Sequence, residues 1–370
     1  MQNNYFLPKT RLFAPLPRPG SMRRVYPLFL PFAGSPQRCL FCAQNAQTGR
    51  STEAVADMLR RADQELATWP PDQGVFELAF FGGTFTLLPQ SERQACLAFF
   101  QRWQSRGLFS SFRCSTRPDA LSPALLDELR KAGCSTVELG VQSFQDTALK
   151  LSGRGYTGSL ARKACSLVLG SGMALGIQLM PGMPGLDLAG ANRDIDDCLA
   201  LSPTCARLYP CLVIRGTALE DIWRAGRYQP WEFEVTLAWL ARACRALEEN
   251  GCAVIRMGLA PEAGLEMAVL AGPRHPEMGN MSRGLALLGH VREQLESWQQ
   301  ETGYEVRKAL LLAPRRVQGM FWGHAGALEG AYADMGLRRR QVRWLDRDNF
   351  LLGIPKPVQD DITQETLNFL

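Results

Sequence analysis

One stretch near the start of the chain decides the fold: Leu28-Phe29-Leu30-Pro31-Phe32-Ala33-Gly34-Ser35-Pro36-Gln37-Arg38-Cys39-Leu40-Phe41-Cys42. Together with the residues before it, its apolar and aromatic first part predicts a strand over residues 25–32. Its second part is a short loop that contains Cys39 and Cys42. A strand that ends in a loop with reactive side chains is typical of parallel α/β sheets, whose chemistry lies at the carboxyl ends of the strands.

An alternation of strands and helices continues from this stretch to about residue 211. Short runs rich in β-branched or aromatic residues predict strands, and amphipathic stretches of helical period between them predict helices. The expected strands are residues 25–32, 75–81, 112–116, 136–139, 174–180 and 206–211. The expected helices are residues 52–68, 90–103, 124–131, 160–169 and 188–199. The third helix has clear end signals, with Ser122 placed as its N-cap, Pro123 in its first turn and Gly133 just past its end.

Six strand–helix units of this kind predict an α/β fold in which a parallel sheet curls into a partial (β/α)6 barrel, similar to a TIM barrel. After about residue 216 the pattern changes and predicts a smaller α/β extension. Its expected elements are helices over residues 232–249 and 281–302 and strands over residues 252–257, 305–312 and 342–345. We therefore expect an N-terminal arm over residues 1–24, the barrel core over residues 25–230 and the extension over residues 231–370.

The composition restricts the class of protein. A chain of 370 residues with 46% hydrophobic and 21% charged residues is globular and long enough for one large domain and a smaller one. Its apolar runs are shorter than the roughly 18 residues of a membrane span, and its N-terminus lacks a signal-peptide core, so we expect a cytoplasmic protein without a membrane partner. The 11 cysteines are scattered and odd in number, which favours reduced thiols or metal ligands over disulfides. A net charge of +5 allows an anionic partner without requiring one.

The loop with Cys39 and Cys42 resembles the cluster loop of radical S-adenosylmethionine (SAM) enzymes. In that family three cysteines spaced C-x3-C-x2-C hold three irons of a 4Fe-4S cluster, and the fourth iron binds SAM; soft thiolate ligands suit such centres. Here Cys39 and Cys42 match the last two positions, and Ser35 stands at the first. Phe41 matches the aromatic residue that the family packs against the adenine of SAM.

The serine at position 35 leaves three interpretations open. A hydroxyl is a harder and far less acidic ligand than a thiol, so the chain can be a diverged form whose cluster is lost or weakened. Alternatively, Ser35 ligates iron as an alkoxide, or another thiol such as Cys114 takes its place. Without the resemblance, Cys39 and Cys42 also fit a simpler interpretation, in which they pack as small apolar side chains.

Further segments extend the resemblance. Phe80-Phe81-Gly82-Gly83-Thr84-Phe85-Thr86 resembles the motif that receives the amino group of SAM, which implies that Gly82, Gly83 and Thr84 line the SAM pocket. Residues 115–119 and 137–144 are similar to motifs of the Elongator catalytic subunit and of the oxygen-independent coproporphyrinogen oxidases. This similarity implies that Gln142 and Arg154 contact SAM, because arginine can pair with a carboxylate in a two-pronged geometry. Gln178 stands where the oxidases have an acidic residue on the SAM ribose, and glutamine there is typical of the Elongator-like bacterial branch.

The resemblance implies a protein that uses a 4Fe-4S cluster and SAM to generate a 5′-deoxyadenosyl radical, which abstracts hydrogen from a substrate. An electron donor such as a flavodoxin or a ferredoxin would be its partner. The substrate is not identified; Arg338, Arg339 and Arg340 would allow RNA, although a solvated basic face explains them as well. The alternatives are a cluster-deficient, non-catalytic SAM- or RNA-binding protein and a porphyrinogen oxidase-like enzyme, which Gln178 disfavours.

Two further expectations follow from the same resemblance. We expect no acetyl transfer to tRNA, because the residues beyond Met281 show neither the length nor the pyrophosphate loop of the Elongator acetyl-coenzyme A domain. The sequence leaves the oligomeric state open.

Overall fold

A computed structural model describes residues 6–17, 24–30, 33–34, 39–42, 54–70, 73–259 and 263–356. By its internal contacts the chain divides into two units. The barrel unit comprises Pro19–Thr236 and Asn250–Pro276, and the terminal unit comprises Met1–Arg18, Leu237–Glu249 and Glu277–Leu370. Helix α9 (Phe233–Glu249) contains one of the points of division.

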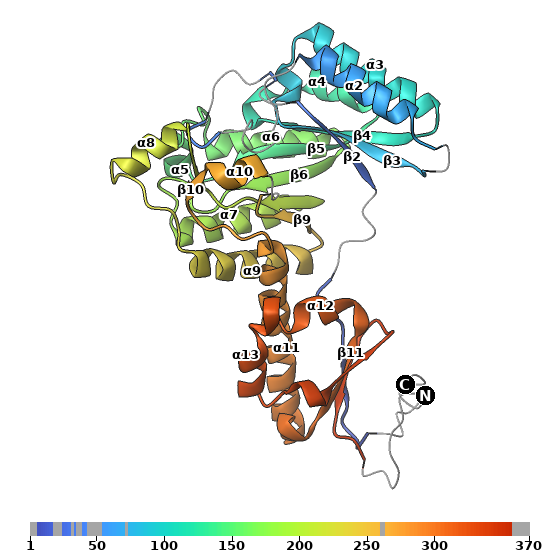
Figure 1. Cartoon of the computed structure of the whole chain (residues 1–370), viewed down its shortest axis with the longest axis vertical. Coiled ribbons are helices and arrows are strands. Elements are labelled where there is room, and N and C mark those ends of the chain that lie inside the picture. The colour runs from blue at the N-terminus through green and yellow to red at the C-terminus, as the bar shows by residue number, and fades with distance from the viewer. Residues whose placement is uncertain are drawn as a thin grey trace. The chain divides into compact units, whose positions relative to one another are not determined.

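The barrel unit is built on a seven-stranded parallel sheet in the order β2-β3-β4-β5-β6-β7-β9. The strands are β2 (Val25–Phe29), β3 (Phe76–Phe81), β4 (Phe109–Thr116), β5 (Cys134–Gln142), β6 (Ala174–Leu179), β7 (Cys205–Leu208) and β9 (Ala253–Met257). The sheet is curled, and helices run along its outer side (Figure 1). These helices are α2 (Val55–Ala67), α3 (Gln90–Ser105), α4 (Pro123–Lys131), α6 (Gly158–Gly170) and α7 (Leu188–Leu201). This is the expected partial barrel.

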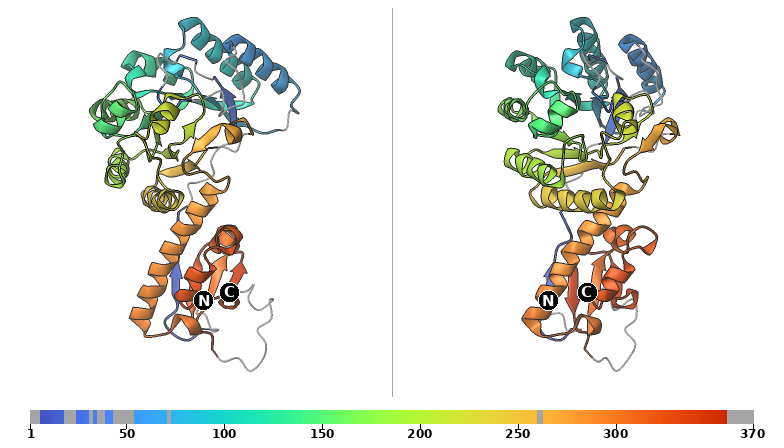
Figure 2. Two further views of the ribbon diagram at one scale, coloured as in Figure 1. Left: turned by 60° about the vertical axis from the view of Figure 1, so that its left-hand side comes forward. Right: turned by 90° about the vertical axis from the view of Figure 1, so that its left-hand side faces the viewer.

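The strand sequences explain why the sheet has two unlike faces. Successive side chains of a strand point to opposite faces, so the fully buried Leu78, Phe80, Val137 and Leu139 share the helix-covered face. The intervening residues, such as Glu77 and Glu138, lie on the other side, which we call the inner face. Figure 2 shows the helices outside the curl and the inner face free of them over most of the sheet.

Helix ends follow the local signals. The Oγ of Ser122 accepts a hydrogen bond from the backbone N–H of Leu125 at 3.3 Å, which confirms the expected N-cap of α4. Gly133 has a φ of +100° after this helix, and a Cβ there would lie 2.9 Å from the ring of Phe100. Shorter helices complete the unit: α5 (Asp146–Leu151), α8 (Ala218–Arg224) and α10 (Ala263–Ala268). Strands β8 (Val213–Ile214) and β10 (Val269–Ala271) form a separate antiparallel pair.

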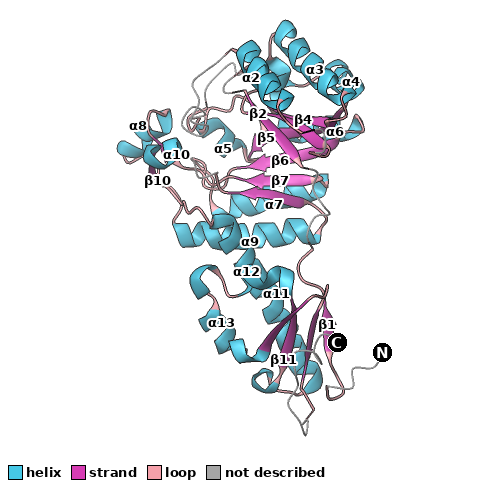
Figure 3. Cartoon of the chain, turned by 45° about the vertical axis from the view of Figure 1, so that its right-hand side comes forward, coloured by secondary structure: helices cyan, strands magenta, loops and turns pink. Residues whose placement is uncertain are grey.

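The terminal unit has its own sheet in the order β1-β13-β11-β12 (Figure 3). Its strands are β1 (Arg11–Phe13), β11 (Leu310–Pro314), β12 (Val342–Leu345) and β13 (Phe350–Gly353). Its helices α11 (Met278–Thr302), α12 (Gln318–Phe321) and α13 (Glu329–Asp334) supply side chains to an apolar core that includes Trp298, Phe321 and Tyr332. Strand β1 pairs antiparallel with β13, so the unit is formed from both ends of the chain.

Two of the expected strands differ from the sequence expectation, and strands β1, β8, β10 and β13 were not predicted. The strand expected at residues 252–257 is β9, which pairs in parallel with β7 as a seventh strand of the barrel sheet instead of belonging to the extension. The strand expected at residues 305–312 begins only at Leu310, because Val306–Lys308 form a 3-10 turn. The limits expected for the three segments stay predictions. None of the helices in the described ranges combines the length and the apolar character needed to cross a lipid bilayer.

Candidate functional site

The two cysteines of the first loop lie in one tight turn after β2. The backbone N–H of Cys42 donates to the carbonyl oxygen of Cys39 at 3.0 Å. Cys39 and Phe41 are buried, and Cys42 is half-buried. The turn therefore holds both thiols in one place, as the expected spacing requires. Ser35 lies outside the described residues.

Two guanidinium groups face Cys39. The Nη1 atom of Arg154 lies 2.9 Å from its sulfur, and the Nη1 atom of Arg117 lies 3.9 Å from it. The hydrogen bond from Cys42 and the positive charge of Arg154 hold the pKa of Cys39 well below its usual range. The Cys39 sulfur is therefore the thiolate of the pair at neutral pH, which is the form that binds metals.

The two arginines differ in how their charges are balanced. Arg117 forms an ion pair with Asp119, with nitrogen–oxygen distances of 2.8 Å and 2.7 Å. Arg154 is 5% exposed and donates to Cys39, to the Tyr156 hydroxyl and to the carbonyl oxygen of Gly140. Within the described residues Arg154 has no carboxylate partner. A buried guanidinium without a carboxylate is suited to receive one from a ligand.

Gln142 ends β5 in an unusual conformation. Its φ of +68° lies in the left-handed region, which side chains other than glycine rarely adopt, and the register of β5 with β6 shifts just before it. Its buried Oε1 atom has no hydrogen-bond partner among the described residues. Gln142 and Arg154 lie together, because a Cβ at Gly140 would be 3.1 Å from Gln142 Nε2 and 3.8 Å from Arg154 Nη2. A strained residue with an unpaired buried acceptor indicates a position held for a ligand.

The glycines after β3 are required by the neighbouring chain. A Cβ at Gly83 would lie 2.2 Å from the carbonyl oxygen of Ala33, and Gly82 has a φ of +99° beside the backbone of Leu30. The backbone N–H of Thr84 donates to the same Ala33 oxygen at 2.8 Å. The close approach of Leu30 and Ala33 is thus sufficient to explain both glycines. The roles of Gly82, Gly83 and Thr84 toward SAM stay predictions.

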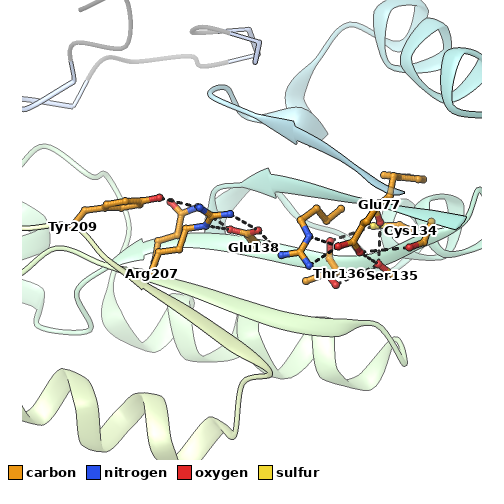
Figure 4. A network of polar contacts seen from close by, with 11 residues as sticks. Glu77, Cys134, Ser135, Thr136, Glu138, Arg207 and Tyr209 are labelled. Carbon is orange, nitrogen blue, oxygen red and sulfur yellow. Dashed lines mark hydrogen bonds and ion pairs between the residues drawn. The ribbon is translucent and has the colours of Figure 1, made fainter. Parts of the chain in front are cut away.

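Gln178 lies on the inner face, where its contact with Glu138 joins it to a network of polar side chains that we call the inner-face network: Glu77, Arg113, Glu138, Arg207 and Tyr209. Figure 4 shows Glu77, Glu138, Arg207 and Tyr209 of this network. Glu138 accepts from Arg207 Nε at 2.6 Å, from Arg113 Nη1 at 3.1 Å and from Gln178 Nε2 at 3.4 Å. Arg113 also donates to Glu77 at 2.7 Å. Burial alone would raise the pKa of Glu138, but the charges of Arg207 and Arg113 hold it below its usual range.

Sequence reasoning missed most of this network. The sequence contains a signal for it, because each of four strands carries a single charged residue, a type that is rarely buried without a partner: Glu77, Arg113, Glu138 and Arg207. Cys114 is the thiol that could take the place of Ser35 as a ligand, and its position in the structure argues against that role. Cys114 is fully buried, its thiol interacts with Cys134, and it faces the helices because its neighbour Arg113 lies on the inner face. All 11 cysteines are free thiols.

A hollow of about 690 Å³ opens beside the loop that follows β6. Gly182, in this loop, has a φ of +80°, and a Cβ there would lie 3.3 Å from the ring of Trp231. Tyr228 donates to the carbonyl oxygen of Gly182 at 2.7 Å, so the segment that carries both aromatic residues is fixed to the loop. No sequence pattern predicts this hollow, because its two walls are far apart along the chain.

Comparison with known families defines the class of protein. The Radical SAM superfamily matches residues 29–198, and the Radical SAM C-terminal domain matches residues 203–284. Together with the curled parallel sheet and its loop of cysteines, these matches show that the chain belongs to the radical SAM superfamily.

Individual relatives are similar to this chain within the Elongator-like branch of the superfamily. The chain is 28% identical over 250 residues to the tRNA uridine(34) acetyltransferase of Methanocaldococcus infernus, a match that covers 56% of this chain and 46% of the relative. It is 29% identical over 189 residues to Elongator complex protein 3 of Mus musculus, which covers 45% of this chain and 34% of the relative. The chain thus matches less than half the length of these curated relatives. A solved structure of the Methanocaldococcus infernus protein, lacking residues 1–46, has a similar fold, with a TM-score of 0.55 at 22% identity over 76% of this chain and 64% of that one.

The residues present fit the two cofactors of the family unequally. Among the described residues Arg154 offers a buried charge that is paired with the Cys39 sulfur and with no carboxylate, and Gln142 offers an unpaired acceptor, so this part of the site fits a zwitterionic ligand such as SAM. The donor set for the cluster does not fit, because two thiols and a serine replace the three thiols that the cluster requires. Among the described side chains, no group of three or more His, Cys, Asp or Glu residues is placed to hold a metal ion.

Proposed function

We propose that this chain binds SAM at the carboxyl ends of β2 to β6, and that its loop of Ser35, Cys39 and Cys42 does not hold a stable 4Fe-4S cluster. One observation carries the proposal: the buried Arg154, without a carboxylate in the described residues, lies close to the side chain of Gln142, whose buried Oε1 atom has no hydrogen-bond partner there. SAM supplies both missing partners. Its carboxylate pairs with Arg154, and one of its N–H or O–H groups donates to Gln142.

The family resemblance supports the other contacts. Phe41 packs on the adenine, while Gly82, Gly83 and Thr84 receive the methionyl amino group. Gln178 approaches the ribose from the inner face, and its bond to Glu138 orients its carboxamide. When SAM enters, Arg154 exchanges the sulfur of Cys39 for the ligand carboxylate. The tRNA chemistry named for the relatives is not transferred to this chain, which covers less than half of them.

A radical-generating enzyme is the second candidate. Cys39 and Cys42 still share one turn, which favours a metal site, and the resemblance allows Ser35 to act as an alkoxide ligand. This function would require an electron donor such as a flavodoxin or a ferredoxin. The two candidate functions predict different measurements. A radical enzyme contains a full complement of cluster iron and releases 5′-deoxyadenosine, whereas a protein that binds SAM without a cluster does neither.

The experiment separates the two functions. The wild type, Ser35→Cys and the control Ser105→Cys, an exposed serine on α3, are reconstituted anaerobically with iron and sulfide. We expect substoichiometric iron and no 5′-deoxyadenosine from the wild type and the control, and a 4Fe-4S spectrum with 5′-deoxyadenosine release from Ser35→Cys. A full cluster and product release in the wild type would establish the second candidate instead.

SAM binding is measured on the same samples by calorimetry. Arg154→Lys is expected to weaken binding by about tenfold or more, because a lysine cannot reproduce the two-pronged pair with a carboxylate. Arg162→Lys is the matched control, since Arg162 pairs with Asp197 on the helical side. Failure of the wild type to bind SAM, or equal binding by the Arg154 variant, contradicts the proposed function.

A further inference from the structure

The inner face continues beyond the inner-face network toward the edge strand β9. Arg256 on β9 is the register partner of Arg207 on β7, so both side chains lie on the inner face. Tyr209 follows two positions after Arg207 and shares this face. Three side chains with hydrogen-bond donors thus lie side by side near the carboxyl ends of two neighbouring strands.

Each nitrogen of Arg207 already donates to a protein group, whereas the terminal nitrogens of Arg256 do not in the described residues. The Nε and Nη2 atoms of Arg207 donate to Glu138, and its Nη1 atom donates to the Tyr209 hydroxyl at 3.2 Å. Arg256 donates only through Nε, to the carbonyl oxygen of Gly258 at 3.3 Å. Within the described residues the two terminal nitrogens of Arg256 have no partner. The side chain is half-exposed, so a ligand can reach these nitrogens.

Tyr209 offers a second unused donor. Its oxygen accepts the hydrogen bond from Arg207, which leaves its own O–H proton without an acceptor in the described part of the chain. Burial raises the pKa of Tyr209, so the hydroxyl keeps this proton at neutral pH. Arg256 is the register partner of Arg207, whose Nη1 atom contacts the Tyr209 hydroxyl. A hydroxyl proton and a guanidinium therefore face one region.

The charges on this face favour an anion. Glu77 and Glu138 compensate Arg113 and Arg207, as their ion pairs show. Arg256 adds a positive charge that no carboxylate in the described ranges balances. Oxygen atoms of a phosphate or a carboxylate match both free donors, because such atoms accept from a guanidinium and a hydroxyl at once.

We infer that Arg256 and Tyr209 form a subsite for an oxyanion group, phosphate or carboxylate, of the substrate that this protein holds beside SAM. The assignment to a substrate rests on the proposed function, because only bound SAM makes the neighbouring group a reaction partner. Arg207 and Glu138 act as positioning residues, since Glu138 fixes Arg207 and Arg207 fixes the Tyr209 hydroxyl. Gln178 lies between this subsite and β5, which carries Gln142.

The test uses the full chain with inorganic phosphate and, separately, acetate at constant ionic strength. Binding is followed by the line width of the phosphate phosphorus resonance and of the acetate resonances. We expect Arg256→Gln to weaken binding of the preferred anion by about tenfold and Tyr209→Phe by roughly threefold, with Arg256→Lys in between. Arg106→Gln is the control, because this exposed arginine stacks on Trp103 at the end of α3.

The outcomes separate the subsite from the proposed function. Equal binding by the wild type and Arg256→Gln, or no binding of either anion above chloride, overturns the subsite. If SAM binds in these samples while the anions do not, the subsite fails and the proposed function stands. If anion binding depends on Arg256 but SAM does not bind, the proposed function fails and the subsite stands as an anion site. The acetate and phosphate arms decide which group it accepts.

Discussion

The loop around Cys39 and the inner-face network both bury charged side chains in the barrel unit, but only in the network is every arginine paired with a carboxylate. In the network, each carboxylate of Glu77 and Glu138 has an arginine partner. Beside the loop, Arg154 rests on a sulfur and Gln142 keeps an unpaired oxygen on strained backbone. A complete set of partners stabilises a fold, whereas an incomplete set lowers stability until a ligand supplies the rest. The comparison therefore separates the ion pairs that stabilise the sheet from the polar groups that are left for a ligand.

The largest expected effect comes from breaking the network. Glu138→Leu leaves Arg113 and Arg207 without their shared carboxylate and should lower the free energy of unfolding by about 3–5 kcal/mol. Urea unfolding followed by circular dichroism measures the loss. The double variant Glu138→Leu with Arg207→Met should recover part of it, because it removes one of the uncompensated charges. A loss below about 1 kcal/mol for Glu138→Leu would show that water replaces the carboxylate and that the network is not structural.

A smaller effect, dependent on pH, is expected at the loop after β5. Asp194 on α7 accepts from the backbone N–H of Phe144 at 2.8 Å and from Gln145 at 3.0 Å, and so holds the residues next to Gln142. Burial raises the pKa of Asp194 to about 6. The native state thus holds this proton more tightly than the unfolded chain does, so stability falls as the pH rises from about 4 through 6.

The measurement is the difference in unfolding free energy between the wild type and Asp194→Asn. The variant keeps an acceptor oxygen and carries no charge, so its advantage over the wild type should grow by roughly 2–3 kcal/mol between pH 4 and pH 7. Asp197→Asn is the control, because Asp197 pairs with Arg162 and is partly exposed. A difference that does not change with pH would mean that Asp194 is ionised throughout.

The smallest effect on stability should accompany a large effect on binding. Gln142→Gly removes a side chain held at a φ of +68° and should raise the free energy of unfolding by about 1 kcal/mol, while weakening SAM binding about tenfold. Ser202→Gly, at an exposed position with a φ of +48°, should stabilise the protein similarly and leave SAM binding unchanged. If Gln142→Gly destabilises the protein and binds SAM as the wild type does, Gln142 belongs with the structural residues.

Local chemistry explains which features could be read from the sequence. The strand–helix alternation, the cap at Ser122 and the turn with Cys39 and Cys42 depend on neighbouring residues, and the structure has all of them. The seventh strand, β9, follows the long helix α9, and its pairing with β7 depends on distant contacts that no local pattern encodes. The same holds for Arg154, whose contact with Cys39 joins residues far apart in the chain.

The face of the sheet toward which a side chain points could not be predicted from the sequence either. Cys114 and Arg113 are adjacent, and only the register of β4 decides that the thiol faces the helices while the guanidinium faces inward. The sequence expectation for Gln178 named a cofactor contact and not its bond to Glu138, because the partner lies on another strand. The roles of the individual residues toward SAM stay predictions until binding is measured.

The pairing of β1 with β13 has a consequence for how this protein forms during translation. All strands of the barrel sheet have been synthesised once the ribosome has passed Met257, so that sheet can assemble while the rest of the chain is still being made. Arg11–Phe13 leave the ribosome long before Phe350–Gly353, their partners in the second sheet, and must wait for them. During that interval β1 is an unpaired strand, and a nascent chain stalled before residue 350 would expose it to other strands.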